Sequence, residues 1–364
     1  MSTGGSRTSW GASMFFSVIY PLLLIVSLVH QNYLRILVVM RRRPTLLMKA
    51  KVRPTTHYVR VCRSIRLFDL YSLDMMSSYL SALYAMYLFE KTRPLPYKTA
   101  ELMLLSQCRQ ENFAWRRAFI NMFIYPQPEP HAEKVLLLHG WDGRSIMLRH
   151  LAQRLQAIGY SVFAPDLPAH GASAGSGVSY YDLSSAVIEI ERQYGRFSVV
   201  VGHSCGGLVG CMAAMQGLYL KRMILIGSPC SFGEVVDNYV LSHKLPGHIA
   251  DAMKKLYQLR YGVHPDKIGP ELIAHIKQPV LILHDKGDIS IGLEEAMVLN
   301  HALGKSKLIV TEGQGHNGAL RDANVFKRIS AFLEPTAQED GCAMAKPVLC
   351  LRPAIELRFK RVKR

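Results

Sequence analysis

Beyond about residue 130, short apolar runs alternate with longer stretches in which apolar residues recur at helical spacing. The short runs predict strands, at residues 135–139, 160–165, 198–201, 223–226, 280–284 and 307–311. The longer stretches predict helices, at residues 146–158, 181–194, 205–218, 294–303 and 319–333. Near-continuous apolar strands that alternate with helices are typical of a parallel sheet covered on both faces. The pattern therefore predicts an α/β fold.

Residues 232–278 interrupt this alternation with a mostly helical pattern. Apolar side chains recur through the stretch, at Val235, Val236, Tyr239, Val240, Leu241, Leu245, Met253, Leu256 and Tyr257. We expect a helical lid inserted above one edge of the sheet. Such a lid either lines a pocket for an acyl chain or only caps the core.

Residues 10–29 carry no charged side chain, and a run of about 20 such residues is long enough to cross a bilayer as a helix. No small-residue cleavage site follows, which argues against a cleaved signal peptide. We expect a single-pass anchor; the alternative is an apolar helix that lies on the membrane surface or packs on the domain. Seven Lys or Arg residues follow at positions 35–53, against Arg7 alone before the segment. The positive-inside rule then places the downstream domain in the cytoplasm.

A second apolar stretch covers residues 67–89, but Asp69 and Asp74 interrupt it. We expect a helix that is buried or packed on the surface of the domain. If this stretch crossed the bilayer as well, the downstream domain would lie on the opposite side.

The formal net charge of +17 is concentrated at the two ends of the chain. Residues 1–66 hold eleven Lys or Arg and no acidic residue, and residues 336–364 hold seven Lys or Arg against three acidic residues. Basic residues beside an apolar segment favour an anionic membrane surface as the partner. No signature of a nucleic-acid-binding fold is present, so we expect no nucleic-acid partner.

These patterns divide the chain into four parts. They are a basic N-terminal segment (1–66) with the candidate transmembrane helix, a helical linker (67–110), an α/β domain with its lid (111–335) and a basic C-terminal tail (336–364).

The seven cysteines are scattered, and no C-x-x-C pair occurs. We expect free thiols in a reducing compartment and no metal site.

The stretch FSVVVGHSCGGLVG (197–210) places a serine between glycines where a predicted strand turns into a predicted helix. Gly202-x-Ser204-x-Gly206 has the spacing of a nucleophile elbow, in which the glycines avoid clashes in a tight turn. The elbow exposes the serine hydroxyl above the sheet. Ser204 is therefore the candidate nucleophile.

A serine hydroxyl needs a base, and the base needs a carboxylate to orient it. Asp288 lies just beyond the strand predicted at 280–284, and Asp285 is its rival three residues earlier. His316 lies in a glycine-bracketed loop after the strand predicted at 307–311. Because ligands bind at the carboxyl ends of parallel strands, these groups are expected to meet there. The order Ser204, Asp288, His316 is the one that accompanies this elbow.

Two backbone N–H groups are candidates for an oxyanion hole. The N–H of Cys205 begins the helix that follows Ser204, and the N–H of Trp141 follows His139-Gly140 at another strand end. A further loop, residues 166–171 (DLPAHG), is predicted to be a structural turn without a catalytic role.

With these residues assigned, the sequence resembles an α/β-hydrolase of the group that contains monoacylglycerol lipases, lysophospholipases and serine aminopeptidase-like enzymes. The matching segments span residues 134–333 and read VLLLHGWDG, YSVFAPDLPAHGASAG, VVVGHSCGGL, PVLILHDKGD and GQGHNGAL. The resemblance implies a mostly parallel eight-stranded sheet, a Ser–His–acid triad and no cofactor. Cys205 departs from the Met, Leu or Gln that is common in the family, but the group that acts there is the backbone N–H.

We predict hydrolysis of a carboxylic ester, lipid-like or hydrophobic, through an acyl-enzyme. An amide or peptide hydrolase, or an acyltransferase, would use the same triad. A non-catalytic binding protein that retains the fold is the remaining alternative.

Overall fold

The structure is a computed structural model that describes residues 77–93, 97–106, 108–116, 118–129, 131–334 and 347–351. Its centre is one eight-stranded sheet. The strands are β1 (Arg109–Trp115), β2 (Ala118–Tyr125), β3 (Lys134–Leu138), β4 (Ser161–Asp166), β5 (Val199–His203), β6 (Arg222–Ile226), β7 (Val280–Asp285) and β8 (Ser306–Thr311). They lie in the order β1-β2-β4-β3-β5-β6-β7-β8.

The sheet is mostly parallel, as predicted. Strands β3 to β8 run parallel to one another, and β2 pairs antiparallel with both β1 and β4. The six strands read from the apolar runs are all present. Strand β1 begins at Arg109, inside the range 67–110 that the sequence assigned to the linker. Its first four residues are polar and only Phe113 is buried, as expected for an edge strand with one face in solvent.

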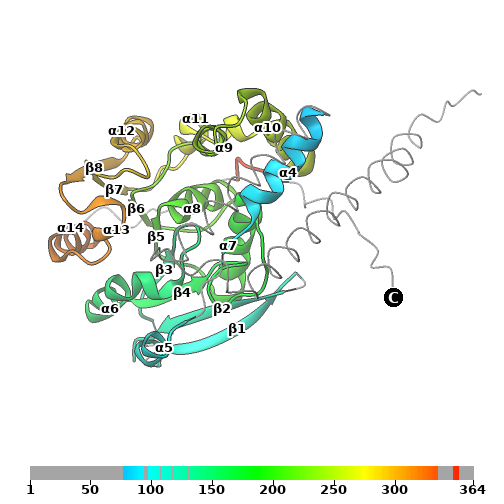
Figure 1. Cartoon of the computed structure of the whole chain (residues 1–364). Coiled ribbons are helices and arrows are strands. Elements are labelled where there is room, and N and C mark those ends of the chain that lie inside the picture. The colour runs from blue at the N-terminus through cyan, green and yellow to red at the C-terminus, as the bar shows by residue number, and fades with distance from the viewer. Residues whose placement is uncertain are drawn as a thin grey trace, which may run out of the picture. The chain divides into compact units, whose positions relative to one another are not determined.

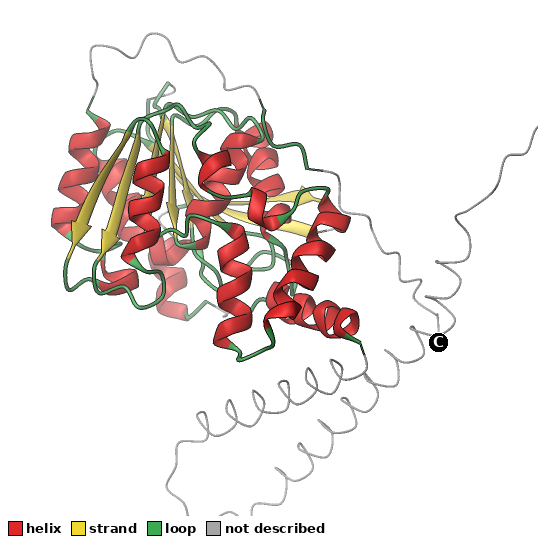
Figure 2. Ribbon diagram, turned by 90° about the horizontal axis from the view of Figure 1, so that it is seen from above, coloured by secondary structure: helices red, strands yellow, loops and turns green. Residues whose placement is uncertain are grey.

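Helices cover both faces of the sheet (Figures 1 and 2). Those after β3 are η3 (Ser145–Leu148), α6 (Arg149–Ala157), α7 (Tyr180–Tyr194), α8 (Cys205–Met215), α12 (Leu293–Ala302), α13 (Gly315–Gly318) and α14 (Ala323–Leu333). The last one starts four residues later than the sequence predicted, at 323 instead of 319. The reason is Asp322, whose carboxylate accepts the N–H groups of Asn324 and Val325 and caps the helix.

Alternation along each central strand separates two hydrophobic cores. In β3, Leu136 and Leu138 pack with α7 and α8, whereas Val135 and Leu137 pack with α6 and α14. Since successive side chains of a strand point to opposite faces, a strand buried on both sides must be apolar at every position. This requirement explains why the central strands could be recognised in the sequence as apolar runs.

Residues 232–278 are mostly helical, as predicted. They form α9 (Phe232–Ser242), α10 (Gly247–Tyr261), η4 (Pro265–Lys267) and α11 (Pro270–Ile273). The buried Lys254 of α10 joins this group, since its Nζ lies 2.6 Å from Asp237 of α9 and 2.8 Å from Asp266 of η4. Two carboxylates around one buried ammonium hold the three elements together.

Among the described residues, two helices precede the sheet, α4 (Ser78–Glu90) and α5 (Thr99–Leu105). Helix α4 packs against α10, which contacts α9 in turn (Figure 1). It buries Ser81, Ala82, Ala85 and Met86, in agreement with the expectation of a helix packed on the domain. No helix in the described ranges is both long and apolar enough to cross a membrane. The candidate span at residues 10–29 lies outside those ranges.

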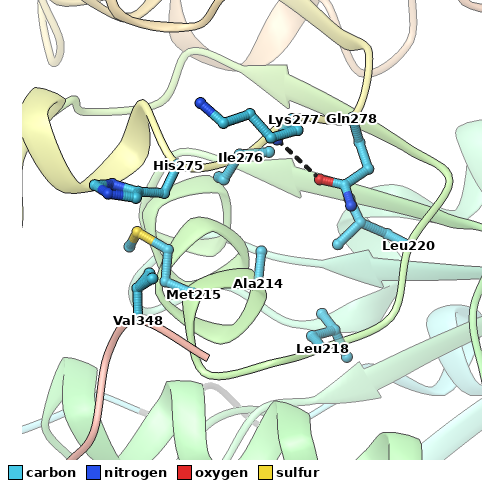
Figure 3. A pocket seen from close by; sticks show the side chains of 9 residues that line it. All are labelled: Ala214, Met215, Leu218, Leu220, His275, Ile276, Lys277, Gln278 and Val348. Carbon is cyan, nitrogen blue, oxygen red and sulfur yellow. Dashed lines mark hydrogen bonds between the residues drawn. The ribbon is translucent and has the colours of Figure 1, made fainter. Parts of the chain in front are cut away.

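The C-terminal residues 347–351 return to the core at the end of α8. The N–H groups of Val348 and Leu349 both donate to the carbonyl oxygen of Met215, at 2.9 Å. An apolar cavity of about 230 Å³ lies beside them, near the amino ends of β6 and β7 (Figure 3). Its lining consists of Ala214, Met215, Leu218, Leu220, His275, Ile276, Lys277, Gln278 and Val348.

The five cysteines in the described residues are all free, as expected.

Helix α8 can lie against the sheet only because it begins with glycines. All eleven of its residues are buried. A Cβ at Gly206 would overlap the carbonyl oxygen of Leu138 and lie 2.6 Å from that of His139, and both of these acceptors are rigid backbone. The helix therefore approaches β3 more closely than any residue with a side chain would allow.

We predict that Gly206→Ala lowers the free energy of unfolding by about 1–3 kcal/mol, because the added methyl group forces the helix away from the sheet. Gly247→Ala is the matched control, since Gly247 is exposed at the start of α10 and a methyl group added there would meet nothing within 4 Å. Urea unfolding of the three proteins measures the difference. An equal effect of both substitutions would contradict the close approach.

Candidate active site

Five of the six parallel strands, β3, β5, β6, β7 and β8, end at the same edge of the sheet beside a predicted site residue or a neighbour of one. Trp141 follows β3, Ser204 follows β5 and Asp288 follows β7. His316 lies in α13, which follows β8. The end of β6 holds Gly227, whose position beside His316 is described below. The edge predicted from strand topology is therefore where these residues gather.

Ser204 sits in the sharp turn between β5 and α8. Its backbone has φ 53° and ψ −125°, a conformation that residues with a side chain rarely adopt. A Cβ at Gly202 would lie 2.5 Å from Gly206 O and Gly207 N, so the turn also needs its glycines. Ser204 itself remains partly exposed. The sequence between the glycines folds as a nucleophile elbow.

Asp288 and His316 form a direct pair. The Asp288 Oδ2 atom lies 2.6 Å from His316 Nδ1, and the carboxylate is fully buried. Its other oxygen accepts the N–H groups of Ser290 and Ile291, at 2.8 and 3.0 Å. With Nδ1–H donated to Asp288, the lone pair of His316 lies on Nε2, as a general base requires.

The end of β6 brings Ser204 and His316 to one place. The N–H of Ser204 donates to the carbonyl oxygen of Ile226 at 2.9 Å. The next residue, Gly227, lies beside the imidazole, because a Cβ there would be 3.4 Å from His316 Nδ1 and 3.3 Å from Asp288 Oδ2. The absence of a side chain at Gly227 leaves the space that the histidine occupies.

His203, the residue before Ser204, adds a second link to the histidine. Its Nε2 lies 2.9 Å from the backbone oxygen of His316, and the two ring centroids are 4.8 Å apart. Burial lowers the pKa of His203 to about 4, so the ring is neutral at pH 7 and donates this hydrogen bond from Nε2–H. His203 therefore holds the loop of the candidate base over the candidate nucleophile.

Hydrogen bonds to the Gly140 oxygen fix the Gly140–Trp141 peptide, and they leave the N–H of Trp141 free. The Gly140 oxygen lies 2.8 Å from His139 Nδ1 and accepts the N–H of Gly143 at 3.0 Å. The N–H of Leu167 donates to His139 Nε2, so the proton of this ring is on Nδ1. In a trans peptide, the N–H points away from the carbonyl. Trp141 N–H therefore points away from His139, and no acceptor for it occurs among the described residues.

The N–H of Cys205 is free as well, because the first residue of a helix has no acceptor within the helix. Gly140 brings the two candidate donors together, since a Cβ on Gly140 would lie 3.1 Å from Ser204 Cβ. Two free N–H groups beside a serine on a strained turn can stabilise an oxyanion.

Comparison with known proteins agrees with this geometry. A family model described as the alpha/beta hydrolase family matches residues 135–327, more than half of the chain. The chain belongs to the alpha/beta hydrolase family. A monoacylglycerol lipase of Mycolicibacterium smegmatis is 28% identical over 203 residues, which cover 52% of this chain and 71% of that protein.

The crystal structure of a candidate lipase from Acinetobacter baumannii superposes with a TM-score of 0.51. It has 20% sequence identity and covers 65% of this hydrolase and 97% of that chain. At this identity, the likeness concerns the fold. The family match begins at residue 135, so α4, α5, β1 and β2 lie outside it.

Asp285, the alternative to Asp288 as the orienting acid, has different hydrogen-bond partners in this hydrolase. Its carboxylate accepts hydrogen bonds from Thr311 Oγ1 and Gln314 N–H, both at 2.9 Å, and from Gly287 N–H at 3.0 Å. Burial opposes its charge, but these hydrogen bonds outweigh burial and lower the pKa of the carboxyl. Asp285 thus holds the loop that leads to His316, whereas Asp288 contacts the imidazole itself.

The Cys205 thiol is buried and stays protonated. Burial raises its pKa to about 12, with the Tyr180 hydroxyl as its polar neighbour. The thiol, for which the sequence indicated no role, is therefore a buried packing group beside the Tyr180 hydroxyl. Since only the thiolate is an effective nucleophile, the protonated Cys205 thiol is not suited to covalent chemistry.

The turn at residues 166–171 is structural, as predicted. Asp166 is fully buried and accepts hydrogen bonds from the Tyr97 hydroxyl and from the N–H groups of Ser145 and Ala172, at 2.8 Å each. A Cβ at Gly171 would overlap this carboxylate. The turn therefore closes around Asp166 and ties β4 to its neighbours.

One group of possible metal ligands occurs among the described residues, formed by Cys230, Glu234 and Glu295. Glu295 already accepts the N–H of Cys230 at 2.7 Å, and the Cys230 Sγ lies 3.8 Å from Glu234. Burial and the two neighbouring carboxylates raise the pKa of the thiol, which keeps it protonated. Metal binding requires a thiolate, so these contacts favour a structural link between the end of β6 and α12.

His203, Gly227 and the loop role of Asp285 were not recognised in the sequence. Histidine is frequent in this chain, with 14 residues, so a histidine inside the elbow motif carried no signal of its own. Gly227 directly follows the strand predicted at residues 223–226. A glycine at a strand end was the feature of the sequence that could have identified it as part of the site. These residues act by placing others, which only the three-dimensional arrangement reveals.

We predict that Asp285→Asn lowers the free energy of unfolding at pH 7 by about 1–3 kcal/mol, since the buried hydrogen bonds to a charged acceptor are weakened. A carboxyl with a lowered pKa stabilises the fold above its unfolded pKa, and this contribution is lost as the pH falls through the folded pKa. The difference between the two proteins should therefore shrink below about pH 4. Asp251→Asn, at an exposed position of α10, is the control in urea unfolding at both pH values. A difference that grows on acidification would refute the role.

Proposed function

We propose that this hydrolase cleaves carboxylic esters with Ser204 as nucleophile, His316 as base and Asp288 as the orienting acid. The contact of 2.6 Å between Asp288 Oδ2 and His316 Nδ1 is the observation that carries the proposal. It supports a polarised imidazole at the same edge of the sheet where Ser204 occupies its strained turn. Neither feature is needed for a protein that only binds a ligand.

The reaction follows the acyl-transfer scheme. Ser204 Oγ attacks the ester carbonyl while His316 Nε2 takes the hydroxyl proton, and the negative charge on the carbonyl oxygen is stabilised by the N–H groups of Trp141 and Cys205. Collapse of this intermediate releases the alcohol, which receives the proton from His316. Water then attacks the acyl-enzyme with the same histidine as base, and the carboxylic acid leaves.

A hydrophobic ester is the substrate class that the surroundings favour. The rings of Phe89 and Tyr180 stack on Trp141. Further aromatic rings surround Phe89, contributed by Phe232, Tyr239 and Tyr257. Apolar and aromatic linings are typical of pockets for apolar ligands. The similarity to a monoacylglycerol lipase supports the same substrate class. In this proposal, residues 232–278 act as the lid.

We expect Ser204→Ala to lower kcat for a p-nitrophenyl ester by about 10³-fold or more, and Asp288→Asn to lower it by about 10²- to 10⁴-fold. Labelling with a fluorophosphonate probe should be lost in Ser204→Ala. Asp251→Asn serves as the control with an exposed carboxylate. Retained turnover in Ser204→Ala would contradict the proposal. Turnover of amides in preference to matched esters would instead favour an amidase on the same triad.

We further infer that residues 10–29 attach the hydrolase to a membrane, with the basic residues that follow on the cytoplasmic side. The absence of charge over a bilayer-spanning length and the seven Lys or Arg at positions 35–53 support this placement. A membrane location would bring the active site to lipid esters.

Arginine near the middle of a membrane-spanning helix costs about 2.5–3.5 kcal/mol. The double variant Leu22→Arg with Leu24→Arg should therefore move the protein from the carbonate-resistant membrane fraction to the supernatant. Leu34→Arg with Leu37→Arg, outside the segment, is the matched control and should remain in the membrane fraction. Equal behaviour of the two variants would contradict the anchor. Digestion of the C-terminal tail in sealed vesicles, before and after permeabilisation, reports the side.

A further inference from the structure

The residues that connect α4 to the core make direct contacts with the loop that carries a candidate oxyanion donor. This loop, residues 139–143, is called the oxyanion loop below. The Phe89 ring stacks on the Trp141 indole, with centroids 6.1 Å apart and an angle of 14° between the planes. Four residues later, the N–H of Arg93 donates to Asp142 Oδ1 at 2.8 Å. Residues 89–93 therefore touch two successive residues of the oxyanion loop.

The oxyanion loop needs such external contacts. Asp142 has φ 54°, a conformation that costs free energy for residues other than glycine unless the surroundings hold it. The loop lies between β3 and η3 and belongs to no regular element. A stacked ring and a hydrogen bond to a carboxylate are two contacts able to fix it.

Phe89 also lies at the centre of the aromatic group beside the candidate site. Its ring centroid is 6.3 Å from Tyr180, 6.3 Å from Phe232, 4.9 Å from Tyr239 and 6.5 Å from Tyr257. Tyr180 in turn stacks on Trp141 at 5.6 Å and borders the Cys205 thiol. Phe89 thus adjoins the Trp141 side chain directly and the Cys205 thiol through Tyr180, and it connects this group to α9 and α10.

Both ends of residues 89–93 are held in place. The Glu90 carboxylate pairs with Arg260 of α10 at 3.1 Å, and the Glu90 backbone oxygen accepts the N–H of Val178 at 2.9 Å. The Thr92 hydroxyl donates to the Ala169 oxygen at 2.7 Å, a buried hydrogen bond. With these anchors, Phe89 and Arg93 keep fixed positions relative to the oxyanion loop.

We propose that residues 89–93, outside the family match, are a positioning element for the oxyanion loop and that Phe89 limits the length of the acyl chain. The backbone N–H of Arg93 holds Asp142, and hence Trp141 N–H, in the orientation for the oxyanion. The Phe89 ring fills the apolar space beside Trp141 that a longer acyl chain would need. The acyl-chain part of this proposal rests on the proposed function, whereas the positioning of the loop does not.

Hydrogen–deuterium exchange of the full chain tests the positioning without any substrate. Phe89→Ala and Asp142→Gly should each raise the exchange rate of the Gly143 amide, which donates to the Gly140 oxygen, about tenfold or more, because a held loop then opens more often. Glycine at 142 removes the carboxylate without straining the positive φ. Tyr79→Ala, an exposed aromatic position on the same helix, should leave the rate unchanged. Exchange in Phe89→Ala and Asp142→Gly equal to the parent overturns the positioning element.

Turnover of p-nitrophenyl esters with acyl chains of increasing length tests the effect on catalysis. Asp142→Gly should lower kcat about tenfold for every chain length with little change in KM, because a displaced donor weakens stabilisation of the transition state. Asp142→Asn keeps an oxygen acceptor for Arg93 N–H and should restore kcat to within about threefold. Failure of Asn to restore kcat, or a change confined to KM, overturns the role of this hydrogen bond.

Phe89→Ala should raise the ratio of kcat/KM for long esters to that for short esters by about fivefold or more, since room for a few methylene groups is gained. Tyr79→Ala should leave this ratio within about twofold of the parent value. A ratio that stays constant or falls in Phe89→Ala overturns the limit on chain length. A parent chain that cleaves no ester and does not label with fluorophosphonate refutes the proposed function and the chain-length limit with it. The exchange rates decide the positioning of the loop in either case.

Discussion

The strained turn at Ser204 is the constraint on which the arrangement of the molecule depends. Holding a serine at φ 53° costs about 1–3 kcal/mol, which the surrounding sheet and helix must offset. They do so through the close approach of α8 to β3, possible only because Gly206 has no side chain. The same turn fixes the direction of the Cys205 N–H. The position of Gly140 beside Ser204 then requires the oxyanion loop to come as close as a glycine allows.

The two aspartates at the end of β7 have different hydrogen-bond partners. Asp285 accepts the Thr311 hydroxyl at the end of β8 and the Gln314 N–H of the loop that follows, so its charge stabilises the fold of that loop. Asp288 gives one oxygen to its own turn and the other to His316. One carboxylate therefore positions the loop and the other orients the ring within it. Both support the same histidine, Asp285 through the preceding loop residue Gln314 and Asp288 through the imidazole itself.

The central strands could be predicted from the sequence because both faces of the sheet are buried there, which makes β3 to β7 apolar at most positions. Strand β8 is only partly buried and was recognised from the apolar residues at its centre. Strands β1 and β2 were not read from the pattern. The exposed alternate residues of β1 resemble a loop in composition, and only the resemblance to a family implied eight strands. Ser204, Asp288 and His316 were readable because each stands at a strand end in a recognisable context. Residues such as His203 and Phe89 act through neighbours that are distant in sequence, and no local pattern marks such contacts.

The strand order has a consequence for where the chain can be divided. Strand β4 lies between β3 and β2, so the hairpin of β1 and β2 covers what would otherwise be an open edge of the sheet. A fragment that begins at the first residue of the family match would expose the backbone of β4 together with the apolar side chains that β2 buries. An uncovered apolar edge strand pairs readily with other chains and promotes aggregation. A fragment of this chain that is to stay monomeric must therefore include β1 and β2, although the family match begins after them.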